Sequence, residues 1–229
     1  MQKILLWDLP TRVFHWLLVM AIGAAWFTGE QGGSWMIWHG RIGLFIIGLI
    51  VFRVCWGIFG STYARFSRFV RGPAAIADYL RGRWQGLGHN PLGALSVLGL
   101  LGLTALQAGS GLFAVNDDIG YTGFLNTLVS SKLGERLTDF HGDCFEVLLV
   151  LIGLHVAAIL FYTHIKKDNL LTPMITGRKS VEQGEPARGG GWLALLVGLL
   201  IAAAVVWGAS GSWIAKPAPA PVQQKAPEW

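Results

Sequence analysis

The sequence predicts an all-α, integral membrane helical bundle. Of its 229 residues, 53% are hydrophobic and only 14% are charged, whereas soluble domains carry about 25% charged residues. Two long stretches, 91–116 and 189–215, contain no charged residue at all. Apolar runs of this length are typical of transmembrane helices, because a backbone in hydrocarbon must satisfy its own hydrogen bonds.

Five transmembrane helices are expected, near residues 13–29, 38–60, 92–114, 141–164 and 192–213. Each is long enough to cross a hydrocarbon core of roughly 30 Å at about 1.5 Å rise per residue. The charges and the proline in the segment WDLPTR before the first apolar run argue against a cleaved signal peptide. The last segment, 215–229, is rich in proline and alanine, and we expect it to be a disordered tail.

Lysine and arginine gather in the connections 61–90 and 165–190, whereas the 30–37 connection has none. Positive charge stays on the cytoplasmic side of a bacterial inner membrane, so the N-terminus is expected inside and the C-terminus in the periplasm. The basic pI of 9.5 therefore reflects topology and does not indicate nucleic-acid binding. The 115–140 connection is net acidic and is expected to be the longest outer loop.

Two histidines, His141 and His155, begin and end the apolar run HGDCFEVLLVLIGLH. Fourteen residues of helix turn through about 1400° and rise about 21 Å, so both imidazoles point to nearly the same face at different depths. In the expected threading, His39 on the second helix lies level with His141, and His15 on the first lies level with His155. Ionisable side chains inside a membrane are costly and usually functional.

One imidazole pair near each membrane surface is what two haems need when facing helices of a bundle hold them. The prediction is that these four histidines hold two haems, one near each membrane surface. His39–Gly40 and His141–Gly142 place a glycine where a haem ring would need space. Arg12, Arg41 and Arg53 are candidate partners for haem propionates, or else residues that set topology.

Other interpretations fit the sequence less well. Zinc needs its ligands clustered in one shell, and a proton relay or transporter needs acidic residues in the middle of its helices. His89 is an alternative inner axial ligand to His15, or a residue that lines a quinone pocket. His164 is expected to be structural, and Cys55 and Cys144 are expected to be buried free thiols.

Several motifs resemble the prokaryotic cytochrome b561 family, which includes the b-type cytochrome subunits of nickel–iron hydrogenases. They are WDLPTRVFHWLL, HGRIGLFIIGLIVFRVCWGIFG, GHNPLG, and HGD…H followed by NLLTPMITGRK. The resemblance covers about residues 5–180. It implies a domain over 1–180 in which a four-helix core, with the fifth helix outside it, holds two haem b groups, with His15, His39, His141 and His155 at the ligand positions. Segment 181–214 then forms a linker and the fifth helix.

The resemblance also implies electron transfer between the quinone pool and a periplasmic redox partner, such as a c-type cytochrome that docks on the acidic outer loop. Whether the chain is itself an enzyme stays open, and a catalytic activity would be that of a quinone-linked oxidoreductase. The alternatives are a membrane anchor for a hydrogenase or another periplasmic oxidoreductase, and an autonomous superoxide:quinone oxidoreductase. A haem-free transport or structural protein is a more remote alternative.

Overall fold

The structure is a computed structural model that describes residues 1–116 and 121–214. Five long helices run through it. Within these residues, all five are long and apolar enough to span a membrane. They are α1 (Leu9–Gln31), α2 (Met36–Phe59), α5 (Pro91–Gly111), α6 (Ser131–His164) and α8 (Gly191–Ala209). The expected all-α membrane bundle is therefore confirmed. The expected disordered tail, 215–229, lies outside the described residues.

The fourth long helix, α6, begins much earlier than the apolar run that predicted it. It starts at Ser131, whose predecessor Ser130 caps it by accepting a hydrogen bond from the backbone N–H of Leu133. Hydropathy detects only the part of a helix that lies in hydrocarbon, and the first turns of α6 are polar. The prediction of a loop over 115–140 was therefore wrong for its second half, and Asp117 and Asp118 lie outside the described residues.

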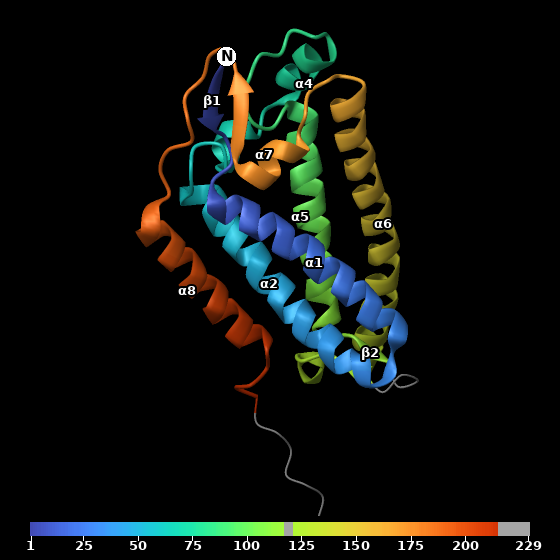
Figure 1. Cartoon of the computed structure of the whole chain (residues 1–229). Coiled ribbons are helices and arrows are strands. Elements are labelled where there is room, and N and C mark those ends of the chain that lie inside the picture. Colours follow the sequence, from blue (N-terminus) through green and yellow to red (C-terminus); the bar gives the residue numbers. More distant parts are fainter. Residues whose placement is uncertain (117–120, 215–229) are drawn as a thin grey trace, which may run out of the picture.

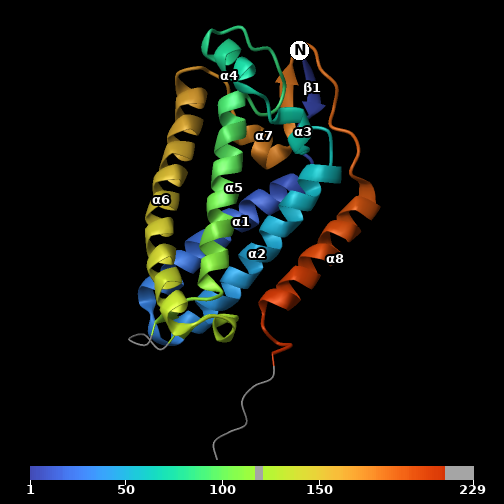
Figure 2. The same ribbon diagram turned by 180° about the vertical axis from the view of Figure 1, so that it is seen from behind.

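The helices form two antiparallel pairs and one outlier. Helix α1 packs along α2, α5 packs along α6, and α2 also contacts α5. Helix α8 packs mainly on α2 and lies on the outer side of α2, away from α6 (Figures 1 and 2). The four helices α1, α2, α5 and α6 therefore make up the core that was expected to hold the site.

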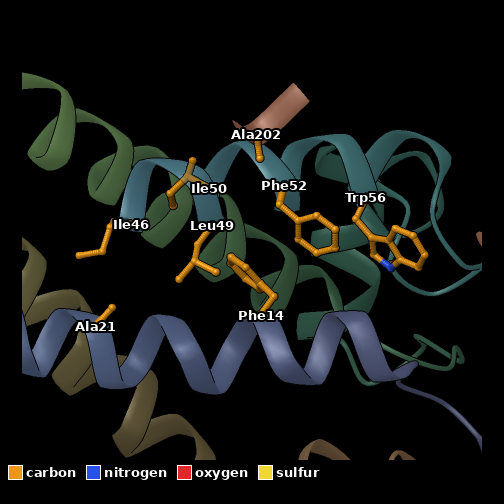
Figure 3. Packing of buried hydrophobic residues seen from close by; sticks show 9 residues of the cluster. Phe14, Ala21, Ile46, Leu49, Ile50, Phe52, Trp56 and Ala202 are labelled. Carbon is orange, nitrogen blue, oxygen red and sulfur yellow. The ribbon is translucent and has the colours of Figure 1, made fainter. Parts of the chain in front are cut away.

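The hydrophobic core lies between α1, α2 and α8 (Figure 3). Its buried members are contributed by α1, α2, α8 and one residue outside the helices: Phe14, Ala21, Ile46, Leu49, Ile50, Phe52, Trp56, Ala64 and Ala202. A Cβ added to Gly48 would lie only 3.0 Å from the side chain of Val206, so glycine lets α8 approach α2 closely.

The two basic connections lie at the same end of the molecule as the N-terminus (Figure 1). There β1 (Gln2–Leu5) pairs antiparallel with β4 (Arg178–Val181). The same connections carry three short helices, which are α3 (Phe66–Phe69), α4 (Pro73–Leu80) and α7 (Leu171–Thr176). A hairpin of β2 (Val115–Asn116) and β3 (Tyr121–Thr122), with a 3₁₀ turn over Asn126–Leu128, lies at the opposite end.

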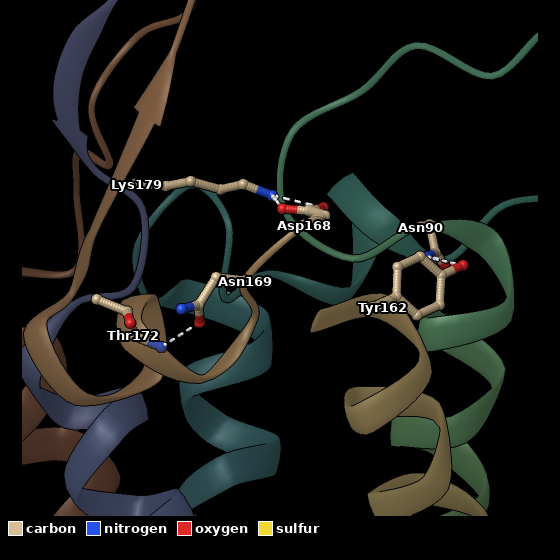
Figure 4. Close-up of polar contacts among 6 residues, drawn as sticks. All are labelled: Asn90, Tyr162, Asp168, Asn169, Thr172 and Lys179. Carbon is tan, nitrogen blue, oxygen red and sulfur yellow. Dashed lines mark hydrogen bonds and ion pairs between the residues drawn. The ribbon is translucent and has the colours of Figure 1, made fainter. Parts of the chain in front are cut away.

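Polar contacts fix the ends of α5 and α6 on the side of the N-terminus (Figure 4). The Asn90 side chain caps α5 by accepting from the N–H of Gly93 at 2.7 Å, and it donates to the Tyr162 hydroxyl at 3.1 Å. Lys179 forms an ion pair with Asp168 at 2.7 Å, just after α6 ends. These contacts hold the end of α6 against the start of α5, beside the deeper histidines.

Candidate functional site

A cavity of about 320 Å³ lies between the four core helices near the β2–β3 end. All four helices α1, α2, α5 and α6 contribute to its wall, which is mostly apolar. Two histidines face it, His39 from α2 and His141 from α6, and their ring centres lie 6.0 Å apart at an angle of 77°. The structure therefore brings together the pair that sequence spacing placed at one level.

Both imidazoles are held from behind by a backbone carbonyl of the neighbouring helix. The Nδ1 of His39 lies 2.8 Å from the carbonyl oxygen of Ala25, and the Nδ1 of His141 lies 2.8 Å from that of Gln107. A carbonyl can only accept, so Nδ1 carries the proton and donates it. Each Nε2 then keeps a free lone pair, which is the arrangement of metal-binding histidines.

The spacing of the two rings fits one metal ion between them. Bonds from imidazole nitrogen to a metal are about 2 Å long, so two rings on opposite sides of one ion have centres roughly 6 Å apart. The observed 6.0 Å agrees with this. Glu30 also lines this mostly apolar cavity, but among the described residues no third His, Cys, Asp or Glu lies where it could share a metal ion with the two imidazoles. Two imidazoles alone are the donor set that holds a b-type haem. The residues present therefore fit the expected haem.

Two glycines on the neighbouring helices make room for the imidazole rings. A Cβ on Gly29 would lie 3.1 Å from the His39 ring, and one on Gly111 would lie 2.9 Å from the His141 ring. The haem space expected at Gly40 and Gly142 stays a prediction. Gly40 faces Phe124 and Tyr121, while Gly142 lines the cavity and a Cβ on it would meet nothing within 4 Å. Sequence inspection missed Gly29 and Gly111, although the pairs Thr28–Gly29 and Ser110–Gly111 near two helix ends were a visible signal.

A second group of histidines lies nearer the N-terminal end of the bundle. The Nδ1 of His155 is 3.3 Å from the Ser96 hydroxyl, whereas the buried Nδ1 of His15 has no hydrogen-bond partner among the described residues. His89 lies against the rings of Trp7 and Phe69, at 4.6 and 4.7 Å between centroids.

His89 lies in the connection before α5 and is partly buried, and its Nδ1 is buried without a hydrogen-bond partner among the described residues. Burial is the main cause that lowers the pKa of His89 to about 3. The positive charge of Arg53 lowers it further, as do His155 and His15 when they carry a proton. The three histidines and Arg53 are therefore close enough to interact, which leaves both His15 and His89 available as partners of His155.

Arg53 is the most buried of the arginines that the sequence singled out, with 3% of its surface exposed. Its guanidinium lies over the Phe66 ring at 4.9 Å, and its Nη1 has no hydrogen-bond partner among the described residues. Among those residues it also forms no ion pair. A buried cation of this kind needs an anion, and a haem propionate would supply one.

Arg12 and Arg41 occupy different surroundings. Arg12 donates from Nη1 to the Ile175 carbonyl at 2.6 Å, while its buried Nε has no partner among the described residues. Arg41 is exposed, lies 5.1 Å over the Trp38 ring, and lines a groove between α1, α2 and α8. Its expected contact with a propionate stays a prediction, and the structure places Arg41 outside the wall of the His39–His141 cavity.

The described residues contain no group of three or more His, Cys, Asp or Glu side chains placed to hold a metal ion. Both cysteines within them are free and buried. Tyr121 from the β2–β3 hairpin, which sequence analysis did not single out, lies edge-on to the His39 ring at 6.4 Å between centroids. The hairpin thus covers the histidine pair from outside the bundle.

Comparison with known families gives one match. A family model described as prokaryotic cytochrome b561 matches residues 6–177, which include all four histidines of the two pairs and end before α8. No curated protein and no solved structure matches the chain.

Proposed function

Because the chain belongs to the prokaryotic cytochrome b561 family, which implies that it binds haem b, we propose that it is a di-haem electron carrier. In this proposal electrons pass between the quinone pool and a redox partner in the periplasm. The observation that carries it is the His39–His141 pair, whose rings lie 6.0 Å apart across a four-helix cavity with both Nδ1 atoms bound to carbonyls.

The second haem is proposed at the level of His155. His15 is its preferred partner, because it lies on the core helix α1 and close enough to His155 on α6 for their charges to interact. His89 is the alternative ligand, and as a non-ligand it would line the pocket for quinone. Arg53 would pair with a propionate, since its buried Nη1 has no partner among the described residues.

Haem b supplies a one-electron couple when it is bound, and the protein supplies the surroundings that set its potential. The apolar helices exclude water, and the carbonyls of Ala25 and Gln107 hold each imidazole in one orientation. The separation of His141 and His155 along one helix, about 21 Å by rise, keeps the two haem levels at a fixed spacing. This arrangement supports transfer across the membrane.

We propose a bacterial inner membrane location with the N-terminus in the cytoplasm and the C-terminus in the periplasm. Its support is the excess of lysine and arginine in the connections 61–90 and 165–190, both on the side of the N-terminus. The His39–His141 pair then lies on the periplasmic side, under the β2–β3 hairpin. A periplasmic c-type cytochrome or oxidoreductase subunit would dock there, and quinone would react near the other pair.

A reduced-minus-oxidised absorption spectrum of the purified chain tests this proposal directly. We expect b-type bands and about two haems per chain, reduced by a quinol analogue and reoxidised by a soluble c-type cytochrome. A spectrum without b-type bands would refute haem binding. If b-type bands are present but a quinol analogue cannot reduce the haems, haem binding is supported and electron exchange with quinone is refuted.

A further inference from the structure

Two short segments on different helices have the same pattern and the same relation to a histidine. They are residues 25–29 on α1, with the sequence AWFTG, and residues 107–111 on α5, with the sequence QAGSG. Each has a hydroxyl residue in fourth place and glycine in fifth. Each lies beside one of the two paired histidines. The α1 segment contacts His39 on α2, and the α5 segment contacts His141 on α6.

In the α1 segment, the carbonyl in first place binds the imidazole and the glycine makes room for it. The Ala25 carbonyl oxygen lies 2.8 Å from His39 Nδ1. The Thr28 hydroxyl lies 3.1 Å from the same oxygen and shares its proton with the Ala24 carbonyl, which is closer at 2.7 Å. A Cβ on Gly29 would lie 3.1 Å from Nδ1 of the His39 ring, closer than most side chains tolerate. Only a residue without a side chain leaves the ring where it is.

The α5 segment repeats these contacts around the other histidine. His141 Nδ1 lies 2.8 Å from the Gln107 carbonyl oxygen, and the Ser110 hydroxyl donates to that oxygen at 2.9 Å. A Cβ on Gly111 would lie 2.9 Å from Cε1 of the His141 ring. The two imidazoles are thus seated on neighbouring helices by equivalent residues, although the segments share no other residue than the final glycine.

We propose that residues 25–29 and 107–111 are matched imidazole seats, in which Gly29 and Gly111 act as positioning residues for the outer haem. This inference rests on the proposed function. A hydrogen bond from Nδ1–H to a carbonyl raises the basicity of Nε2 and fixes the ring, so the seats strengthen electron donation to the iron. They thereby favour the oxidised iron and lower the reduction potential of the outer haem.

The deeper histidines lack such seats. His155 meets only the Ser96 hydroxyl, at 3.3 Å, and His15 Nδ1 has no partner among the described residues. The effect of the seats is therefore confined to one haem. That difference lets an experiment separate positioning of the outer ligands from a general effect on the fold.

The test compares Gly111→Ala and Gly29→Ala with the control variants Gly102→Ala and Gly23→Ala on the same two helices. A Cβ on either control glycine meets nothing within 4 Å. Each full-length protein is purified with its haem, the two haems are titrated potentiometrically, and haem content is measured from the absorption spectrum. A His141→Ala variant, which lacks the outer haem, identifies the step that belongs to it.

The expected result is a change at the outer haem alone. In the seat variants its reduction step moves to higher potential or its affinity falls by roughly 10- to 100-fold, the usual effect of losing a partner of a metal ligand. The inner step and both controls stay as in the natural protein. A retained inner haem also shows that a variant has folded. If Gly111→Ala aggregates, the test rests on Gly29→Ala, whose added Cβ makes the milder contact.

Two results overturn the inference. Unchanged outer steps in both seat variants would show that the glycines position nothing, and equal shifts of both haems in seat and control variants would show a general effect. If the natural protein holds no haem, the proposed function fails as well. If the natural protein holds two haems and the seat variants behave like the control variants, this inference fails and the proposed function stands.

Discussion

The rings of His39 and His141 lie 6.0 Å apart at an angle of 77°, each held by a carbonyl of the helix next to its own. His39 from α2 and His141 from α6 are therefore positioned by carbonyl groups on α1 and α5. The pair depends on all four core helices at once, because each ring and each carbonyl belongs to a different helix. This dependence makes the pair a sensitive probe of the proposed site.

Loss of either ring should remove the same haem. We expect His39→Ala and His141→Ala each to lower the haem content from about two per chain to about one, since a bis-histidine site needs both ligands. Haem content per chain, measured from the absorption spectrum, checks this. The control is His164→Ala, because His164 is exposed at the end of α6. Retention of both haems after either substitution would contradict the pairing.

The inner ligand can be decided by a similar comparison. We expect His15→Ala and His155→Ala to remove the second haem, and His89→Gln to retain it. The reason is that His15 lies on a core helix, as His155 does, whereas His89 lies in the connection before α5 and packs against the rings of Trp7 and Phe69. Spectra of the three variants check this. The opposite result, with the haem lost only in His89→Gln, would assign the ligand to His89.

Arg53 should raise the potential of the inner haem. A buried cation near the iron favours the reduced state, which carries one positive charge fewer. We expect Arg53→Gln to lower the inner step by on the order of 60 mV, which is a tenfold change in equilibrium constant for one electron. Potentiometric titration measures it. Arg41→Gln is the matched control, because Arg41 is exposed over Trp38, and an equal shift there would point to long-range charge alone.

Much of this architecture was visible in the sequence because hydrophobic runs and charge placement follow from the membrane itself. The five helices and the shared level of His39 and His141 depend on length, polarity and the helix period. The early start of α6 at Ser131 was missed because its first turns are polar. The seats of His39 and His141 were missed because their acceptors are backbone carbonyls, which leave no mark on residue type.

The burial of His89 predicts how stability depends on pH. Burial, reinforced by the charge of Arg53 and then of the nearby histidines, lowers the pKa of His89 from 6.5 to about 3. Between about pH 6.5 and about pH 3, His89 is protonated in the unfolded chain and neutral in the folded chain. Folding stability from this group is therefore complete above about pH 6.5 and is lost as the pH falls towards about pH 3.

We expect the natural protein to lose stability on acidification by up to about 1.4 kcal/mol per pH unit from this one group. His89→Gln should lose less, because glutamine does not titrate. Thermal unfolding in detergent, measured from about pH 7 down to about pH 4, gives the difference between the two proteins. His164→Gln, which changes an exposed histidine, should follow the natural protein, and equal acid sensitivity of all three would exclude His89 as the cause.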